Sequence, residues 1–155
     1  MATIPLPPDF SASLKLLNAH DVRYLLISGY AVAYYGYVRA TADMDLWVPR
    51  ERENAERLVD ALRAFGFGVP ELEAEVFLKK NRIIRMGVPP MRIEFATSIS
   101  GVEFEPCYAE RLIAEWDDVE VSIISLARLK QNKQAAGRLK DLTDLEYLEE
   151  AGQPE

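Results

Sequence analysis

Short apolar segments of strand length alternate with segments of helical periodicity early in the chain, and this alternation constrains the fold more than any other feature. Residues 11–20 have apolar side chains at helical spacing, and the apolar run at 21–28 predicts a buried strand. Three segments follow: a short helix over 30–36, a strand over 44–49 and an amphipathic helix over 50–68 that ends at Gly66. Such alternation predicts a sheet with helices packed on it.

The second half of the chain predicts further strands and ends in helices. Residues 81–87 and 91–97 predict two strands, and the connection between them is too short for a crossover, which favours antiparallel pairing. Residues 120–125 predict a last strand, and 126–152 predict a helical segment with a break near Gly137. The predicted fold class is therefore α/β (α+β), a mixed sheet flanked by helices with C-terminal helices.

The length of 155 residues suits one domain better than two. We expect a single domain over residues 1–155, with a core over about 22–124 and a C-terminal helical segment over about 125–150.

Two carboxylates stand at the start of the predicted strand over 44–49, in the stretch RATADMDLWV. Alternate residues of an extended chain point the same way, so Asp43 and Asp45 share one face. Glu94 adds a third carboxylate in the strand over 91–97. If the two strands are neighbours, the three acids converge, and a hard divalent cation such as Mg²⁺ would neutralise their repulsion.

Each of these features also has a purely structural interpretation. Asp43 and Asp45 could line a solvated strand edge, with Glu94 paired to Arg92 or Arg39. The Ser28-Gly29 junction, where a strand meets a helix, could bind phosphate through helix N-terminal amides or could be simple turn chemistry.

Composition excludes several classes of function. The formal net charge of -7 argues against a general binder of the phosphate backbone. One cysteine, Cys107, and one histidine, His20, leave little material for disulfides, a cysteine-rich zinc site or Ser-His-Asp catalysis, so both are interpreted as structural. No apolar run is long enough to span a bilayer, and we expect neither export nor a membrane partner but a cytoplasmic location.

Three segments together resemble the DNA polymerase beta-like nucleotidyltransferase superfamily. LLISGYAVAYYGYVRATADMDLWV is similar to its strand, glycine turn and aspartate pair, and PPMRIEFATSISGVEF to the segment with the third acid. ISLARLKQNKQAAGRLKDLTDLEYL is similar to the terminal helices of the abortive-infection toxin-like branch (AbiEii type). The resemblance covers roughly residues 22–148; it departs from the usual pattern in the Ser-Gly turn and in Glu94, where aspartate is more usual.

The resemblance implies transfer of a nucleoside monophosphate from a nucleoside triphosphate, ATP among them, to an acceptor hydroxyl. In that chemistry Asp43 and Asp45 hold two Mg²⁺ ions, or Mn²⁺ in their place, Glu94 holds the catalytic ion, and Ser28-Gly29 cradles the triphosphate. The acceptor can be RNA, protein or a small molecule. A toxin–antitoxin or phage-defence setting and a cognate partner protein are also implied.

Four further residues are candidate nucleotide-binding residues. Arg39 and Thr41 flank the acids, and the resemblance points to Lys133 and Asp141 in the terminal helices, although a solvated helix face is the plainer interpretation of those charges. If Lys133 reaches the triphosphate, Lys133→Ala should weaken triphosphate binding with little loss of stability, whereas unchanged binding would indicate a solvated helix face. The alternative to an enzyme is a catalytically silent module of the same fold that acts as a toxin-neutralising or regulatory partner.

Overall fold

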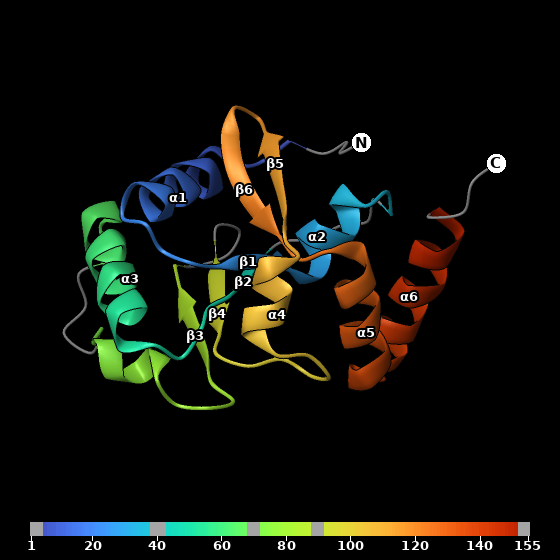
Figure 1. The fold of residues 1–155 in the computed structure, drawn as a ribbon. Coiled ribbons are helices and arrows are strands. Elements are labelled where there is room, and N and C mark those ends of the chain that lie inside the picture. The colour runs from blue at the N-terminus through green and yellow to red at the C-terminus, as the bar shows by residue number, and fades with distance from the viewer. Residues whose placement is uncertain (1–4, 38–42, 68–71, 88–91, 152–155) are drawn as a thin grey trace.

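The computed structural model describes residues 5–37, 43–67, 72–87 and 92–151 (Figure 1). In chain order the elements are α1 (Pro8–Ala19), β1 (Leu25–Ile27), α2 (Ser28–Tyr34), β2 (Met44–Trp47), α3 (Arg52–Phe65), the 3₁₀ helix η1 (Ala74–Phe77), β3 (Ile83–Met86), β4 (Ile93–Ala96), α4 (Phe104–Ala109), β5 (Leu112–Trp116), β6 (Val119–Ile123), α5 (Leu126–Ala136) and α6 (Leu139–Ala151).

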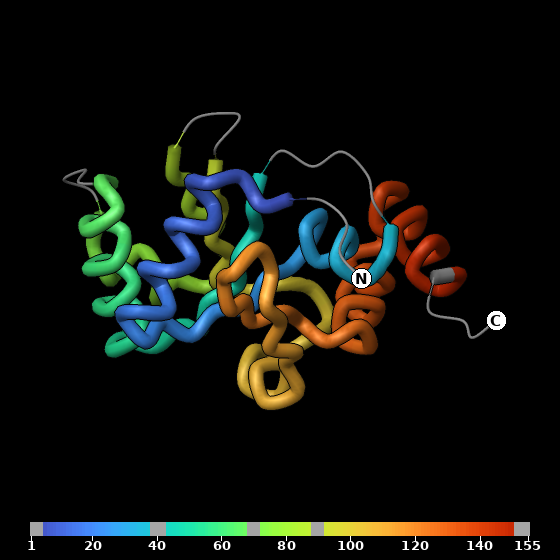
Figure 2. Tube along the Cα trace, turned by 90° about the horizontal axis from the view of Figure 1, so that it is seen from above, coloured from blue at the N-terminus to red at the C-terminus, as the bar shows by residue number. Residues whose placement is uncertain are grey.

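The strands form one six-stranded mixed sheet in the order β3-β4-β2-β1-β6-β5. β2 pairs with β4 and β1 with β6 in parallel, while the other neighbours are antiparallel. This arrangement confirms the predicted mixed sheet and the antiparallel pairing of the segments around 81–87 and 91–97. In both Figure 1 and Figure 2, α1 and α3 lie toward one end of the molecule and α5 and α6 toward the other.

Two glycines end helices as the sequence predicts. Gly66 caps α3 with φ of 117°, and Gly137 separates α5 from α6 with φ of 66°, both in the left-handed region that glycine adopts without strain.

The sequence prediction lacked α4, β5 and η1. β5 and β6 form a hairpin closed by Asp117 and Asp118, whose φ values of 50° and 65° match a two-residue turn with both central residues left-handed. Asp117 is further held because its carboxylate accepts a hydrogen bond from the Leu6 amide at 2.7 Å. An Asp-Asp pair is a weaker sequence signal for such a turn than Asn-Gly, and β5 therefore escaped notice.

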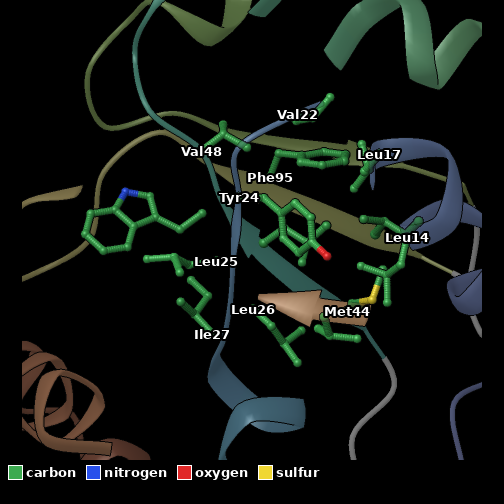
Figure 3. Packing of buried hydrophobic residues seen from close by; sticks show 14 of the residues in the cluster. Leu14, Leu17, Val22, Tyr24, Leu25, Leu26, Ile27, Met44, Val48 and Phe95 are labelled. Carbon is green, nitrogen blue, oxygen red and sulfur yellow. The ribbon is translucent and has the colours of Figure 1, made fainter. Parts of the chain in front are cut away.

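One face of the sheet carries the hydrophobic core. Leu46 and Phe95 are paired in register on β2 and β4, and both are fully buried. Phe95 contacts Phe77 of η1 edge to face, with ring centroids 6.0 Å apart. Leu14 and Leu17 of α1 belong to the same buried cluster as Phe95 (Figure 3). α1 and η1 therefore cover this face of the sheet.

The opposite face carries polar residues at its centre. Asp45 and Glu94 are paired in register, and side chains alternate along a strand, so both point away from Leu46 and Phe95. Trp47 shares their face and packs edge to face on Phe104 of α4, with ring centroids 5.2 Å apart. α4 thus covers this face near Trp47, beside the acids.

The tyrosines of α2 are packed rather than presented to a ligand. Tyr30 is 4% exposed, and the rings of Tyr30 and Tyr34 lie 6.1 and 5.6 Å from that of Trp116. Among the helices that the structure describes, none has both the length and the apolar character needed to cross a membrane.

Candidate active site

Asp43, Asp45 and Glu94 line the same pocket, which has a volume of about 610 Å³. Asp45 and Glu94 are direct neighbours on the parallel strands β2 and β4, and Asp43 precedes β2 by one residue. Neighbouring strands are about 4.8 Å apart, so the register brings the two strand acids close together. The adjacency of the two strands, on which the sequence prediction depended, is therefore present.

Two arginines neutralise part of this acidic cluster. Arg92 Nη2 donates to Asp43 Oδ2 at 2.8 Å, and Arg92 Nε lies 3.7 Å from Glu94 Oε1. Arg85, which faces Glu94 across the β3–β4 pair, donates to Glu94 Oε1 at 3.0 Å. The Glu94–Arg92 pairing that the sequence offered as a structural interpretation is thus present, together with contacts that it did not anticipate.

The pKa of Asp45 is raised, although its charge and that of Arg92 attract each other. Burial raises the pKa of Asp45 to about 7, and the charge of Glu94, hydrogen bonding with Glu94 and the charge of Asp43 act in the same direction. A hydrogen bond from the Ser28 hydroxyl acts in the opposite direction and lowers the pKa. A cation bound nearby would strongly stabilise the ionised form of such a carboxyl group.

The donor chemistry suits a divalent metal ion, although the acids are not preassembled around one. Three carboxylates on one pocket wall are the ligands that hard cations such as Mg²⁺ prefer. Within the described ranges, however, no three acidic, histidine or cysteine side chains are already close enough together to hold an ion. Binding would require side-chain rotations, which the contacts of Arg92 and Arg85 oppose.

The strand-to-helix junction places Ser28, rather than Gly29, in the pocket. Ser28 lines the pocket and has φ of 61°, a left-handed conformation that costs a residue with a Cβ roughly 1–3 kcal/mol. Gly29 is buried in the first turn of α2. The left-handed backbone at this junction therefore belongs to the serine, whose hydroxyl reaches Asp45.

Lys133 reaches the same pocket from α5 and is buried. Its Nζ lies 3.4 Å from Asp141 Oδ1 and 3.1 Å from Asp144 Oδ2, and both aspartates belong to α6. Arg138 Nε donates to Asp141 Oδ2 at 2.6 Å. The solvated helix face considered from the sequence is wrong for Lys133, because α6 packs over it.

The electrostatics of Asp141 agree with this arrangement. Burial by itself raises its pKa, but the hydrogen bond from Arg138 and the charges of Lys133 and Arg138 outweigh burial and leave the pKa below its ordinary value. Asp144, which sequence reasoning did not single out, follows Asp141 by one helical turn and so meets the same lysine. The three-residue spacing of Asp141 and Asp144 on a predicted helix was the sequence feature from which the role of Asp144 could have been inferred.

The far wall of the pocket was not anticipated. Ser98, Ile99 and Ser100 line it from the segment after β4, and Asn132 Nδ2 of α5 donates to the Ser100 carbonyl at 3.0 Å. Gly101, with φ of 79°, allows close approach, since a Cβ there would lie 2.4 Å from Ala135 Cβ. The segment is thereby held against the helix that carries Lys133.

Arg39 and Thr41, both predicted to contact nucleotide or acceptor, lie outside the described residues. For the remaining predicted site residues, the structure brings Ser28, Asp43, Asp45 and Glu94 to one pocket, and Lys133 and Asp141 line it as well. Their roles in binding or catalysis stay predictions.

Comparison with known proteins bears on the fold. No family model matches the sequence, and no curated protein does. Among solved structures, the lincomycin-bound lincosamide antibiotic adenylyltransferase LnuA is similar with a TM-score of 0.57 and 12% identity, over 96% of this chain and 99% of that one.

Two further solved structures are similar. An antigenic nucleotidyltransferase-like protein from Paracoccidioides brasiliensis has a TM-score of 0.55 and 18% identity, over 98% of this chain and 81% of that one. A protein from Thermotoga maritima assigned to the nucleotidyltransferases has a TM-score of 0.56 and 15% identity, over 91% of both chains. Together with the mixed sheet and its flanking helices, these similarities show that the chain has the nucleotidyltransferase-like fold.

Proposed function

We propose that the protein is a metal-dependent nucleotidyltransferase, which transfers a nucleoside monophosphate from a nucleoside triphosphate to an acceptor hydroxyl. The observation that carries the proposal is that Asp45 and Glu94, on neighbouring parallel strands, and Asp43, one residue before β2, line one pocket, which a lysine lines as well. The fold shared with an adenylyltransferase agrees with this chemistry.

In this proposal Asp43 and Asp45 would hold two Mg²⁺ ions, or Mn²⁺, with Glu94 on the catalytic one. When bound, the ions supply charge neutralisation at the attacking oxygen and at the leaving pyrophosphate. The acceptor oxygen forms a bond to the α-phosphorus as the bond from that phosphorus to the bridging oxygen breaks. Glu94, held by Arg85, would accept a hydrogen bond from the acceptor hydroxyl, orient it and take its proton as the new bond forms.

The triphosphate would lie along the other side of the pocket. Ser28 is placed to hydrogen-bond a phosphate oxygen, and Lys133 offers an ammonium group that Asp141 and Asp144 keep fixed. A fixed cation stabilises the charge that develops on pyrophosphate without reorganisation. Arg39 and Thr41 are proposed to complete the contacts with phosphate or acceptor.

The acceptor is proposed to be a small hydroxylated molecule, RNA or a protein. A small molecule is favoured by the fold shared with a lincosamide antibiotic adenylyltransferase, and RNA is disfavoured by the net charge of -7. Membership of the abortive-infection toxin-like branch, with a toxin–antitoxin setting and a partner protein, remains part of the proposal and rests on the sequence resemblance of the terminal helices.

One observation favours a second candidate, a catalytically silent binding module. Arg92 and Arg85 already satisfy Asp43 and Glu94, and a silent module would need no more than such ion pairs. The raised pKa of Asp45 argues against this candidate. A buried carboxylate with a raised pKa destabilises the folded state at neutral pH, and a silent module does not need one, whereas a metal site does.

The deciding experiment is transfer of label. The protein is incubated with each of the four α-³²P ribonucleoside triphosphates, Mg²⁺ or Mn²⁺ and cell extract, and the labelled product is identified. We expect Asp43→Asn to abolish labelling and Asp60→Asn, an equal change at an exposed position of α3, to leave it intact. Labelling that survives Asp43→Asn would reject the proposed mechanism.

A further inference from the structure

We propose that Arg92 links metal binding to triphosphate binding: its guanidinium occupies Asp43 until a triphosphate offers it another anion, so that the two ligands bind cooperatively. This inference rests on the proposed function. It begins with the two carboxylates that Arg92 contacts, since both would be metal ligands.

Arg92 holds Asp43 through two nitrogens on a single oxygen. Nη2 and Nε lie 2.8 and 3.3 Å from Asp43 Oδ2, and Nε lies 3.7 Å from Glu94 Oε1. A divalent cation that joins Asp43 to Glu94 must come within a few ångströms of this guanidinium. Since both are positive, cation and guanidinium compete for the same carboxylates.

The side chain is free to leave while its backbone is fixed. The Arg92 carbonyl accepts a hydrogen bond from the Met44 amide at 3.1 Å, which ties Arg92 to β2 between the two aspartates. The Arg92 side chain keeps 33% of its surface exposed, and Asp43 keeps 21%. Rotation of the Arg92 side chain therefore breaks ion pairs that are partly exposed to solvent and leaves the hydrophobic core unchanged.

A triphosphate provides the displaced guanidinium with a new partner. Any phosphate bound through metal to Asp43 and Glu94 lies beside the place that Arg92 now occupies, and guanidinium binds phosphate with two parallel hydrogen bonds. Metal that binds alone must displace Arg92 from Asp43, and the guanidinium then has no new anionic partner. When triphosphate binds together with the metal, its phosphate replaces the lost carboxylate partner. The result is a positive coupling between the two ligands.

Arg85 does not serve the same purpose. It contacts Glu94 at 3.0 Å across the strand pair, but no contact with Asp43 is found for it among the described residues. Among the residues that the structure describes, Arg92 is the cation that contacts both Asp43 and Glu94, so removal of its charge acts on both carboxylates.

The test measures binding rather than turnover. Mn²⁺ and inorganic tripolyphosphate, which carries the triphosphate charge without a base, are titrated separately and together into wild type and Arg92→Gln by calorimetry, with correction for Mn²⁺–tripolyphosphate complexes formed in solution. Arg82→Gln is the matched control, because Arg82 is an exposed arginine that begins the segment leading into β3. Arg92→Lys retains the charge.

We expect Arg92→Gln to bind Mn²⁺ alone about 5- to 10-fold more tightly and to lose about tenfold of the coupling, within the usual range for linked sites. Arg82→Gln should match wild type, and Arg92→Lys should keep most of the coupling. Unchanged or weaker Mn²⁺ binding by Arg92→Gln, with the coupling intact, overturns the inference.

The outcomes separate this inference from the proposed function. If wild type labels an acceptor but Arg92→Gln leaves the Mn²⁺ affinity and the coupling unchanged, the inference alone fails. If wild type binds Mn²⁺ but neither tripolyphosphate nor any labelled nucleotide, the proposed function fails, and the coupling fails with it. Wild type that binds no Mn²⁺ overturns both.

Discussion

Replacement of Lys133 by methionine should cost the protein a large part of its stability. Lys133 has 3% of its side chain exposed, and its partners Asp141 and Asp144 have 1% and 2%. Methionine fills nearly the same volume but leaves the two buried carboxylates without the ammonium between them. This outcome is opposite to the small stability effect expected from a solvated lysine.

The magnitude follows from what remains after the substitution. Loss of one partner of a buried ion pair typically costs about 3–5 kcal/mol, because the remaining charge is uncompensated. Arg138 still donates to Asp141 at 2.6 Å, so part of the charge stays balanced. We therefore expect the lower end, about 3 kcal/mol off the free energy of unfolding.

Urea unfolding followed by tryptophan fluorescence is a suitable assay. Urea is uncharged and does not screen ion pairs, and Trp47 and Trp116 are both buried, so their emission reports unfolding. Lys130→Met is the control, because Lys130 is only partly buried and takes part in no ion pair among the described residues; it should change stability by about 0.5 kcal/mol or less.

A double mutant separates charge from packing. Adding Asp144→Asn to Lys133→Met removes one of the two carboxylate charges that faced the ammonium, and we expect it to restore about 1–2 kcal/mol relative to the single mutant. The reasoning is refuted if Lys133→Met unfolds within about 0.5 kcal/mol of wild type, since that result would mean that the buried ion pairs carry no net energy.

Three further predictions follow from the site. Asp43→Asn should abolish Mn²⁺-supported nucleotide transfer yet shift the free energy of unfolding by no more than about 1 kcal/mol, because its pair with Arg92 is partly exposed; complete unfolding of the purified variant would contradict this. In EDTA, the pKa of Asp45 in the folded state is raised to about 7, so between about pH 4 and 7 the folded protein keeps a proton that the unfolded chain loses. The contribution of this group to stability is therefore present near pH 4 and is lost as the pH rises to 7. The free energy of unfolding of Asp45→Asn, relative to that of wild type, should therefore be higher at pH 8 than at pH 5 in urea titrations. The same difference at both pH values would argue against the raised pKa. Gly101→Ala should lose about 1–3 kcal/mol in thermal or urea unfolding, because its Cβ would lie 2.4 Å from that of Ala135 and its φ is 79°. Ala135→Gly by itself costs about 1 kcal/mol within α5, so Gly101→Ala is also measured in that background. There it should cost less, because the clash is removed and only the cost of φ remains, and an equal cost in both backgrounds would show that the close contact is not the cause.

Local patterns predicted the elements whose signals are themselves local. Gly66 and Gly137 end α3 and α5 because a left-handed residue is a property of one turn of chain. Besides the weak turn signal of Asp117-Asp118, β5 has two consecutive apolar residues, Leu112 and Ile113, at its start, so its sequence does not alternate clearly and the strand was not predicted.

The sequence by itself determined that Asp43 and Asp45 share a face, because alternation along a strand is set by covalent geometry. Only the tertiary structure decided which groups meet them. It placed β4 in parallel beside β2, so that Glu94 came level with Asp45, and it brought Arg85 to Glu94 and Arg92 to Asp43 and Glu94.

The same division holds for Lys133. The sequence predicted that Lys133 lies on a helix, but its burial depends on the turn at Gly137. This turn folds α6 back against α5 and places Asp141 and Asp144 over the ammonium. The physical reason is that periodicity specifies directions within one element, whereas burial and pKa depend on charges and surfaces that other elements supply.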